Sequence, residues 1–307
     1  MNEEMFDILF LGTGASVPSR DRSLPCVAVR QGRSITLFDC GEGSQRQLMV
    51  SPFSFMKVDR IFISHLHGDH ILGLPGLLQT MGMSGRKDPV SVFGPKGTSK
   101  ALGDMLGACE GNIEYELEIQ DLEGGETFDF DDFSVTSFRT EHNVPSLGFV
   151  YRECDRPGTF NREKAEKLGL EPGEDFARLQ SGETVKGVRP EQVIGPLKTG
   201  CSMVYTGDTV PCDEVVRVSE GTDVLIHEST YVDEDSELAK LHFHSTARSA
   251  AEIAAKCKVR MLALIHISNR YGDAEPPLTE AKMYFENTIA PSDLQMVTVT
   301  NGNIRLQ

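Results

Sequence analysis

The sequence predicts an α/β protein, an αβ/βα four-layer sandwich with two sheets inside, helices outside and an inserted, protruding arm. Short apolar segments typical of strands alternate with segments of helical periodicity in the first half, and the same alternation returns near residue 200. Between these similar halves, residues 152–198 are rich in glycine, proline and paired charges. We therefore expect a single domain over residues 1–307, with residues 152–198 as a flexible arm.

The first half opens with strand-like segments. The apolar run Phe6–Leu11 is bounded by the turn Gly12-Thr13-Gly14, and further β segments lie on either side of Gln31-Gly32. The expected strands are residues 6–11, 26–30, 35–39, 58–64, 90–93, 113–119 and 133–138. The expected helices run from the loop at 41–44 through Met49, over 71–81 and over 96–106.

The second half repeats the order of strand followed by helix. The expected strands are residues 202–206, 223–227, 260–265 and 295–299, and the expected helices are 211–218, 246–256 and 278–287. In such α/β units, functional groups usually lie in the loops at the carboxyl ends of the strands.

Composition favours a globular protein of the cytoplasm. Hydrophobic residues make up 39% of the chain and charged residues 25%, as in ordinary globular domains. The first residues are acidic where a secretory signal would be basic, and no apolar run is long enough to span a membrane. The seven cysteines are scattered without a CxxC pair, which indicates reduced thiols.

The net charge of −16 argues against a nucleic-acid partner, because binding a polyanion normally requires a basic surface that releases counterions. Net charge is a sum, however, and a local basic patch can steer RNA on an acidic protein. Residues 152–198 contain nine basic and nine acidic side chains, so this segment is neutral within a strongly acidic chain.

The segment His65-Leu66-His67-Gly68-Asp69-His70 is the densest group of metal-ligating residue types in the chain. It follows the expected strand 58–64, so its side chains should lie in a loop at a strand's carboxyl end. Three imidazoles and a carboxylate within six residues suit zinc. The sequence therefore predicts a metal site here rather than a polar turn with chance histidines.

Other polar residues also follow expected strands. His142 and His266 each end a strand, and Asp208 sits in Gly207-Asp208-Thr209, where a carboxylate with two oxygens can bridge two metals. Each of these residues alone is more often structural. Asp39 supports the ligand-bearing loop or is an ordinary turn carboxylate, and the sequence leaves both roles open.

This order of residues, an HxHxDH loop followed by a histidine, a Gly-Asp-Thr and another histidine, resembles the metallo-β-lactamase superfamily over nearly the whole chain. Within it, four further segments resemble motifs of the ribonuclease Z family. They are Phe38-Asp39-Cys40-Gly41-Glu42-Gly43-Ser44-Gln45-Arg46-Gln47, His266-Ile267-Ser268-Asn269-Arg270-Tyr271, Leu225-Ile226-His227-Glu228-Ser229-Thr230-Tyr231 and His244-Ser245-Thr246-Ala247.

The resemblance implies two zinc ions per subunit. One would be bound by His65, His67 and His142, and the second by Asp69, His70 and His266, with Asp208 bridging them. Asp69 would also accept the proton of the nucleophile. His244 is the expected acid for the leaving group, and Glu228 would hold its ring, although His244 could instead simply cap a helix.

The resemblance further implies a substrate and an assembly. The expected reaction is zinc-dependent hydrolysis of precursor tRNA next to the discriminator base, which leaves a 3′-hydroxyl on the tRNA and a 5′-phosphate on the trailer. The arm at 152–198 would bind the tRNA, and the family favours a homodimer.

Two other functions stay open at this point. A two-zinc hydrolase of small phosphodiesters or lactones would use the same ligands, but it would need neither the arm nor the pair Glu228 and His244. A zinc-bearing binding subunit without catalysis would be expected to have an incomplete ligand set, whereas this sequence has the full set.

Overall fold

The computed structural model describes residues 5–110 and 113–307 and divides the chain into two compact units. We call Met1–Arg152 with Cys201–Gln307 the large unit, and Glu153–Gly200 the small unit. In the described part of the chain, no helix has the length and apolar character needed to cross a membrane.

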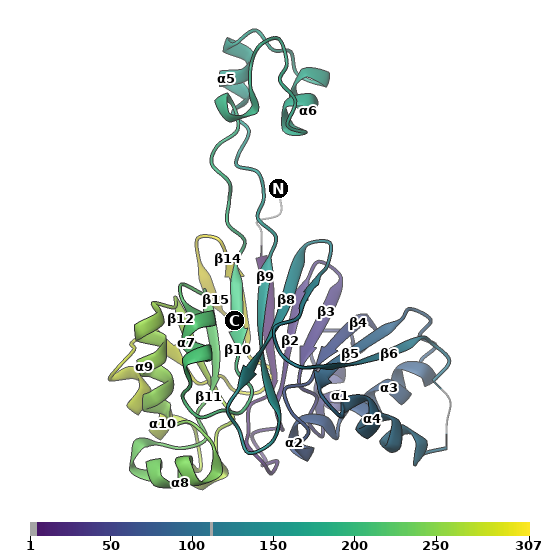
Figure 1. Ribbon diagram of the computed structural model, residues 1–307, viewed down its shortest axis with the longest axis vertical. Helices are drawn as coiled ribbons and strands as arrows, with labels where there is room; N and C mark the ends of the chain where they lie inside the picture. Colours follow the sequence, from purple (N-terminus) through teal and green to yellow (C-terminus); the bar gives the residue numbers. More distant parts are fainter. Residues whose placement is uncertain (1–4, 111–112) are drawn as a thin grey trace. The chain divides into compact units, whose positions relative to one another are not determined.

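The large unit contains two sheets (Figure 1). Among the described residues, the first sheet has the strand order β15-β14-β1-β2-β3-β4-β5-β6. Its strands are β1 (Met5–Gly12), β2 (Cys26–Gln31), β3 (Ser34–Phe38), β4 (Val58–Phe62), β5 (Val90–Pro95), β6 (Leu117–Leu122), β14 (Met296–Thr300) and β15 (Ile304–Leu306). Strands β3 to β6 run parallel, so their carboxyl ends share one edge of the sheet.

The second sheet has the order β13-β12-β11-β10-β9-β8-β7 within the described residues. Its strands are β7 (Thr127–Asp129), β8 (Phe133–Thr140), β9 (Ser146–Glu153), β10 (Ser202–Tyr205), β11 (Val224–Glu228), β12 (Met261–Ile265) and β13 (Thr288–Ile289). Strands β10 to β13 are parallel, so the loops that follow β10, β11 and β12 also gather at one edge.

Three apolar cores hold the layers together. Alternating side chains of both sheets meet in the central core, where Phe62 stacks on Phe93 with ring centroids 4.7 Å apart. The opposite face of each sheet packs against helices, which Figure 1 shows on the two outer sides. The helices on the first sheet are α1 (Ser44–Val50), α2 (Gly68–Ile71), α3 (Leu74–Met83) and α4 (Thr98–Gly107). Those on the second sheet are α7 (Asp213–Ser219), α9 (Ala247–Cys257) and α10 (Glu275–Lys282). The four-layer αβ/βα sandwich expected from the sequence is therefore confirmed.

Several elements differ from the sequence expectation. The helix expected over 71–81 is split into α2 and α3, the helix expected over 278–287 ends at Lys282, and the strand expected over 113–119 starts only at Leu117. Strand β9 was not expected because Gly148 interrupts its apolar pattern. A Cβ at Gly148 would lie 2.2 Å from the ring of Phe138, so close packing excludes any other residue. Helix α8 (Ser236–His242) also escaped prediction, since it buries only Ala239 and has little apolar periodicity.

The small unit has its own structure, although the sequence pattern predicted no element there. It contains helices α5 (Arg162–Lys167) and α6 (Glu174–Gln180) and the 3-10 turn η2 (Pro190–Gln192). Asn161 accepts a hydrogen bond from Lys164 N at 2.9 Å and so caps α5. The unit has a small apolar core, formed by Ala165, Leu170, Leu179, Val185, Val188 and Val193.

Candidate metal centre

The loop after β4 carries the histidine-rich segment at the carboxyl edge of the first sheet. His70 N donates to His67 O at 3.0 Å, which starts the short helix α2. The loop after β3 packs tightly beneath it, because a Cβ at Gly41 would lie 2.3 Å from the carbonyl oxygen of Asp69. These contacts explain why a glycine stands at position 41.

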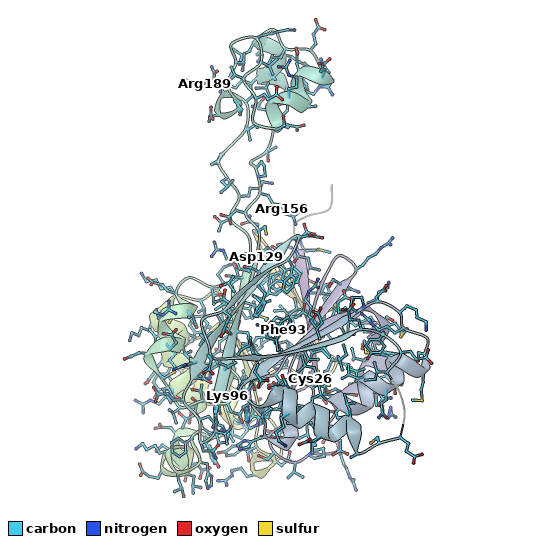
Figure 2. All side chains as sticks on the ribbon, turned by 45° about the vertical axis from the view of Figure 1, so that its right-hand side comes forward. Cys26, Phe93, Lys96, Asp129, Arg156 and Arg189 are labelled. Carbon is cyan, nitrogen blue, oxygen red and sulfur yellow. The ribbon has the colours of Figure 1, made fainter. Side chains whose placement is uncertain are left out.

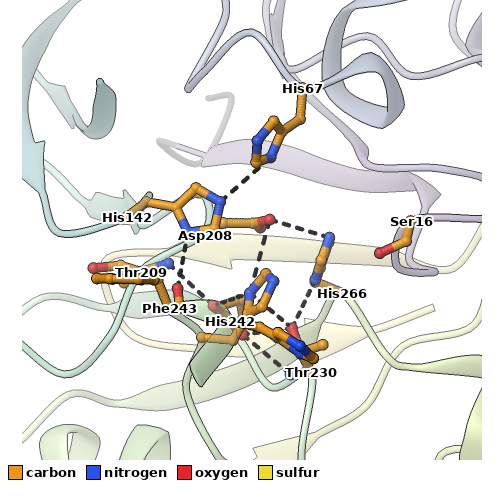
Figure 3. Close-up of polar contacts among 12 residues, drawn as sticks. Ser16, His67, His142, Asp208, Thr209, Thr230, His242, Phe243 and His266 are labelled. Atoms are coloured by element: carbon orange, nitrogen blue, oxygen red, sulfur yellow. Dashed lines mark hydrogen bonds and ion pairs between the residues drawn. The ribbon is translucent and has the colours of Figure 1, made fainter. Parts of the chain in front are cut away.

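His65, His67 and His142 form the first ligand group, because one ring nitrogen of each lies within 4.8 Å of those of the other two. Figure 3 shows the contact between His67 and His142. His67 Nδ1 lies 3.0 Å from His65 Nε2 and 3.3 Å from His142 Nε2. Two nitrogens bound tetrahedrally to one zinc at about 2.0–2.1 Å would stand about 3.3 Å apart. The spacing therefore fits one shared metal ion.

Asp69, His70 and His266 form the second ligand group. Asp69 Oδ2 lies 3.7 Å from His70 Nε2 and 3.5 Å from His266 Nε2. Both nitrogens are buried and have no hydrogen-bond partner among the described residues. Because a buried polar atom without a partner is costly, these two nitrogens indicate a site built for a cation.

Asp208 lies between the two groups. Its Oδ2 is 3.3 Å from His266 Nε2, 3.4 Å from His70 Nε2 and 3.7 Å from His65 Nε2. Gly207 allows this approach, since it has a φ of 59° and a Cβ there would lie 2.6 Å from Ser64 Cβ. One carboxylate therefore faces ligands of both groups.

The charges of the cluster also suit a metal. Burial lowers the pKa of His65 well below its ordinary value, and His70 nearby lowers it further, so His65 is neutral, the form that can bind a metal. Burial alone would raise the pKa of Asp69 and of Asp208, but the surrounding histidines outweigh it and hold both carboxyls ionised. His70 differs from His65: burial lowers its pKa, but Asp208 and Asp39 outweigh burial and raise the pKa well above its ordinary value, so His70 must lose a proton when a metal binds. Imidazoles beside ionised carboxylates form a donor set that matches zinc.

His244 lies beside both ligand groups. It comes from the segment after α8 and not from the loop after β4. Its Nδ1 is 2.8 Å from Glu228 Oε1 and 3.9 Å from Asp208 Oδ2. Burial lowers the pKa of His244, but the charge and hydrogen bond of Glu228 outweigh it and bring the pKa to about 9. A ligand atom of His244 also falls within 4.8 Å of those of His142 and Asp208, so distance alone does not separate an acid from a ligand.

Glu228 is fully buried at the end of β11 and is held from several sides. It accepts hydrogen bonds from Thr209 N at 3.0 Å, Thr230 N at 3.1 Å and Thr230 Oγ1 at 2.6 Å. Its fixed carboxylate orients the ring of His244 in turn.

Asp39 is a buried part of this site, which decides between the two roles left open by the sequence. The carboxylate is 0% exposed and lies 2.7 Å from His70 Nδ1. It accepts from Ser64 N at 2.6 Å, from Ser64 Oγ at 2.7 Å and from Tyr205 OH at 2.6 Å. Asp39 therefore fixes the ring of His70 and the loop that carries it.

Strained backbone also surrounds the site. Left-handed φ angles occur at Ser16 (57°), Asp39 (59°), Phe243 (59°) and His266 (55°). Ser16 N donates to Asp69 Oδ2 at 2.9 Å, and Phe243 O lies 2.8 Å from His142 Nδ1. Such conformations are unfavourable for residues with side chains and tend to occur where function requires them.

The structure brings every site residue expected from the sequence into one cluster. Those residues are His65, His67, Asp69, His70, His142, Asp208, Glu228, His244 and His266. His227 and His242 lie beside it with other partners, namely Glu228 O at 2.7 Å and Tyr231 OH at 2.6 Å. The supporting residues Ser16, Ser64, Tyr205 and Phe243 gave no signal in the sequence, because their contacts join distant segments. Thr230 lies in one of the motif segments, but the sequence assigned it no role.

Comparisons with known protein families agree with this fold. Residues 6–155 match the family described as anti-Pycsar protein Apyc1, and residues 177–267 match the β-lactamase superfamily domain. The chain is 44% identical over 306 residues to ribonuclease Z of Methanosarcina acetivorans, covering 96% of this chain and 98% of that protein. It is also 44% identical over 303 residues to ribonuclease Z of Archaeoglobus fulgidus, with the same coverage of both chains.

Solved structures show the same architecture. The crystal structure of human tRNase Z, short form, superposes with a TM-score of 0.69 and 28% identity over 94% of this chain and 98% of that chain. The metallo-β-lactamase fold protein YhfI from Bacillus subtilis superposes with a TM-score of 0.70 at 18% identity, over 96% of this chain and 100% of that one, a likeness of fold alone.

Proposed function

Because the chain belongs to the ribonuclease Z family of hydrolytic endoribonucleases with the metallo-β-lactamase fold, we propose that it cuts precursor tRNA next to the discriminator base. The reaction breaks the bond between phosphorus and the 3′-oxygen of the tRNA. It leaves a 3′-hydroxyl on the tRNA and a 5′-phosphate on the trailer. The observation that carries the proposal is the joining of two ligand groups through Asp208 with the pair Glu228 and His244 beside them.

Two zinc ions would occupy the two ligand groups in each subunit, with Asp208 as the shared ligand. The orphaned nitrogens His70 Nε2 and His266 Nε2 support this assignment. When bound, two such ions lower the pKa of a water molecule towards neutrality and stabilise charge on the attacked phosphate.

Asp69 and His244 move the protons. Asp69 Oδ2 is held by Ser16 N at 2.9 Å, and the carboxylate accepts the proton of the attacking water. His244 acts as the general acid and donates a proton to the departing 3′-oxygen of the tRNA. Glu228 positions the imidazole and favours its charged form, so a poor alkoxide leaving group departs as a hydroxyl.

The small unit would bind the precursor tRNA as the arm. Residues 152–198 carry nine basic and nine acidic side chains within a chain of net charge −16, so this segment repels an RNA backbone less than the chain as a whole. Its own apolar core supports this role, because a folded element can present basic side chains in fixed positions. Folded RNA is recognised largely by shape and backbone contacts, so a sequence-specific surface is not required.

We further propose that the enzyme is a homodimer of the cytoplasm. Met49 of α1 and Leu72, which precedes α3, are exposed apolar side chains. Met49 and Leu72 line one shallow hollow, and exposed apolar patches of this kind mark interfaces. All seven cysteines lie in the described part of the chain and are free thiols, which fits a reducing compartment.

The test is cleavage of a 3′-extended precursor tRNA by zinc-loaded protein, beside a His67→Ala variant and with bis(p-nitrophenyl) phosphate as a small substrate. A single cut next to the discriminator base, lost in the variant, is the expected result. A protein in which residues 159–195 are replaced by a short linker should keep hydrolysis of the small diester and lose the tRNA cut. Hydrolysis of the small diester alone by the intact protein would establish the small-substrate hydrolase instead.

A further inference from the structure

Helix α8 ends at the rim of the metal centre in an unusual way. His244 N donates to Ala239 O at 2.8 Å and Phe243 N to Lys240 O at 3.3 Å, the hydrogen-bond pattern of a Schellman motif. The residue in left-handed conformation at such an end is usually glycine, because a side chain crowds the backbone there. Here it is Phe243, with a φ of 59° and a ψ of 48°.

Burial does not account for a phenylalanine at this position. The side chain of Phe243 is 45% exposed and belongs to none of the apolar cores of the described residues. Its backbone has a use, since the carbonyl oxygen lies 2.8 Å from His142 Nδ1, a contact drawn in Figure 3. Glycine or asparagine would supply the same carbonyl with less strain. Neither core packing nor the backbone contact therefore explains why the side chain at position 243 is aromatic.

A hollow of about 950 Å³ opens beside this ring. Val144, Pro145 and Val210 give it apolar walls, and His142 joins it to the metal centre. Lys96 and Lys240 also line it, and Figure 2 labels Lys96, which directly follows β5 at the carboxyl edge of the first sheet. Arg139 adds a third basic side chain to the lining, against the carboxylates of Glu123 and Glu141. Apolar walls, an exposed aromatic ring and flanking ammonium groups match the chemistry of an unpaired nucleotide.

Resting on the proposed function, we propose that Phe243 stacks on an unpaired base beside the scissile phosphate and that Lys96 and Lys240 contact the neighbouring backbone. Stacking on an aromatic ring tolerates every base, because each has a π-face. That tolerance suits an enzyme whose substrates differ in sequence around the cut. The base belongs either to the discriminator nucleotide or to the first nucleotide of the trailer, and both present the same chemistry.

The first experiment compares Phe243→Tyr, Phe243→Leu and Phe243→Asn in cleavage of precursor tRNA. Tyrosine keeps a ring and should keep kcat/KM near that of the wild type. Leucine and asparagine should lower kcat/KM roughly five- to a hundred-fold, the range for loss of one base–aromatic stack. Asparagine tolerates the left-handed conformation, so Phe243→Asn should melt no lower than the wild type while cutting more slowly.

Two matched controls come from the same chain. Lys258 ends α9 in the same hydrogen-bond pattern with a φ of 54°, and Leu241 is a 66% exposed apolar residue of α8. Lys258→Asn and Leu241→Ala should leave cleavage unchanged. Zinc content is measured for every variant. If Phe243→Asn loses zinc in proportion to its activity, the residue acts only through His142 and the proposal is wrong.

The second experiment locates the base. Precursors with an abasic site at the discriminator or at the first trailer position are cut by the wild type and by Phe243→Asn. At the stacked position, the abasic site should slow the wild type and leave the variant unaffected. In an uncleavable precursor with a methylene group in place of the scissile 3′-oxygen, 2-aminopurine at that position should be quenched by the wild type but not by the variant.

The outcomes separate this inference from the proposed function. Absence of any cut by the wild type refutes the proposed function and the inference with it. A correct cut by the wild type, together with wild-type rates for both Phe243→Leu and Phe243→Asn or with no coupling at either abasic position, refutes the stacking role alone.

Discussion

The two ligand groups meet at Asp208, yet the chain holds them by different means. In the second ligand group, His70 and His266 are each 1% exposed. Their outer nitrogens face a buried carboxylate and a buried hydroxyl, Asp39 Oδ2 at 2.7 Å and Thr230 Oγ1 at 2.7 Å. Each of these partners makes further hydrogen bonds within the large unit, so the rings have little freedom to turn.

The first ligand group is more open. His65 is buried, but His67 and His142 are partly exposed. His142 is held through the carbonyl oxygen of Phe243, at a strained end of a short helix. The second ligand group is therefore held by buried polar partners, whereas the first lies beside the hollow next to Phe243 and is held in part by a backbone carbonyl. We therefore expect a chelator to remove zinc from the first ligand group before the second.

The largest effect should follow from removing the residue that the two groups share. Asp208→Ala takes a ligand from both positions, and the charge stabilisation by metal that it supports is worth several kcal/mol. Precursor cleavage should fall about a thousandfold or more, and bound zinc should drop well below two per subunit. Zinc content by atomic absorption and single-turnover cleavage measure both effects. Retention of two zinc ions with little loss of rate would show that the groups are independent.

A smaller loss of cleavage activity is expected from Glu228→Gln. Glu228 lies beside both ligand groups and belongs to neither. The variant should cut roughly 10–100-fold more slowly, because His244 loses the carboxylate that orients and charges it, while zinc content stays at the wild-type level. His244→Ala should slow the reaction further, and the double variant should be no slower than His244→Ala, since the two residues act as one unit. Loss of zinc from His244→Ala would identify His244 as a ligand.

Asp39→Asn should act on the second ligand group. Replacing the carboxylate beside His70 should weaken zinc binding at that group by roughly 10–100-fold, the usual cost of removing the outer partner of a histidine ligand. The order of zinc release during chelator titration should then reverse. Asp7→Asn is the matched control, because Asp7 is also buried and ion-paired, with Arg30 at 2.6 Å, and lies outside the cluster. An unchanged order of release would contradict the role of Asp39.

Much of this fold could be predicted from the sequence, because buried strands such as β1 and β12 are largely apolar segments. Short elements that bury few side chains could not be predicted from the sequence. Helix α8 buries one alanine, and the helices of the small unit pack on a core too small to produce a periodic pattern. Local propensity cannot reveal elements whose stability comes from contacts with distant segments.

The candidate site divides in the same way. The ligand types at strand ends could be found by chemistry and order along the chain, so His65 and Asp208 were expected before the structure was known. Tyr205 is an ordinary strand-end residue in the sequence, and Thr230 lies in a motif without an assigned role; only the fold brings their hydroxyls to Asp39 and His266. The left-handed φ of Phe243 is likewise invisible, since the sequence gives a phenylalanine where such a helix end normally has glycine.

The smallest effect should come from Tyr205→Phe, which tests how the support of the second ligand group is distributed. The variant removes the hydroxyl that donates to Asp39 Oδ2 at 2.6 Å but keeps the buried ring. A hydrogen bond to a charged group contributes about 1.5–3 kcal/mol to the free energy of unfolding, so the melting temperature should fall by several degrees.

Zinc affinity should fall only a few-fold in Tyr205→Phe, because Asp39 keeps both contacts to Ser64 and its contact to His70. Tyr115→Phe provides the control, since that hydroxyl donates to Leu78 O at 2.9 Å away from the site and should change stability without changing zinc affinity. A loss of zinc as large as that in Asp39→Asn would mean that Tyr205, rather than the loop carrying Ser64, holds the carboxylate in place. The zinc affinity of the second ligand group would then depend on one contact between the two sheets, the hydrogen bond from Tyr205 to Asp39.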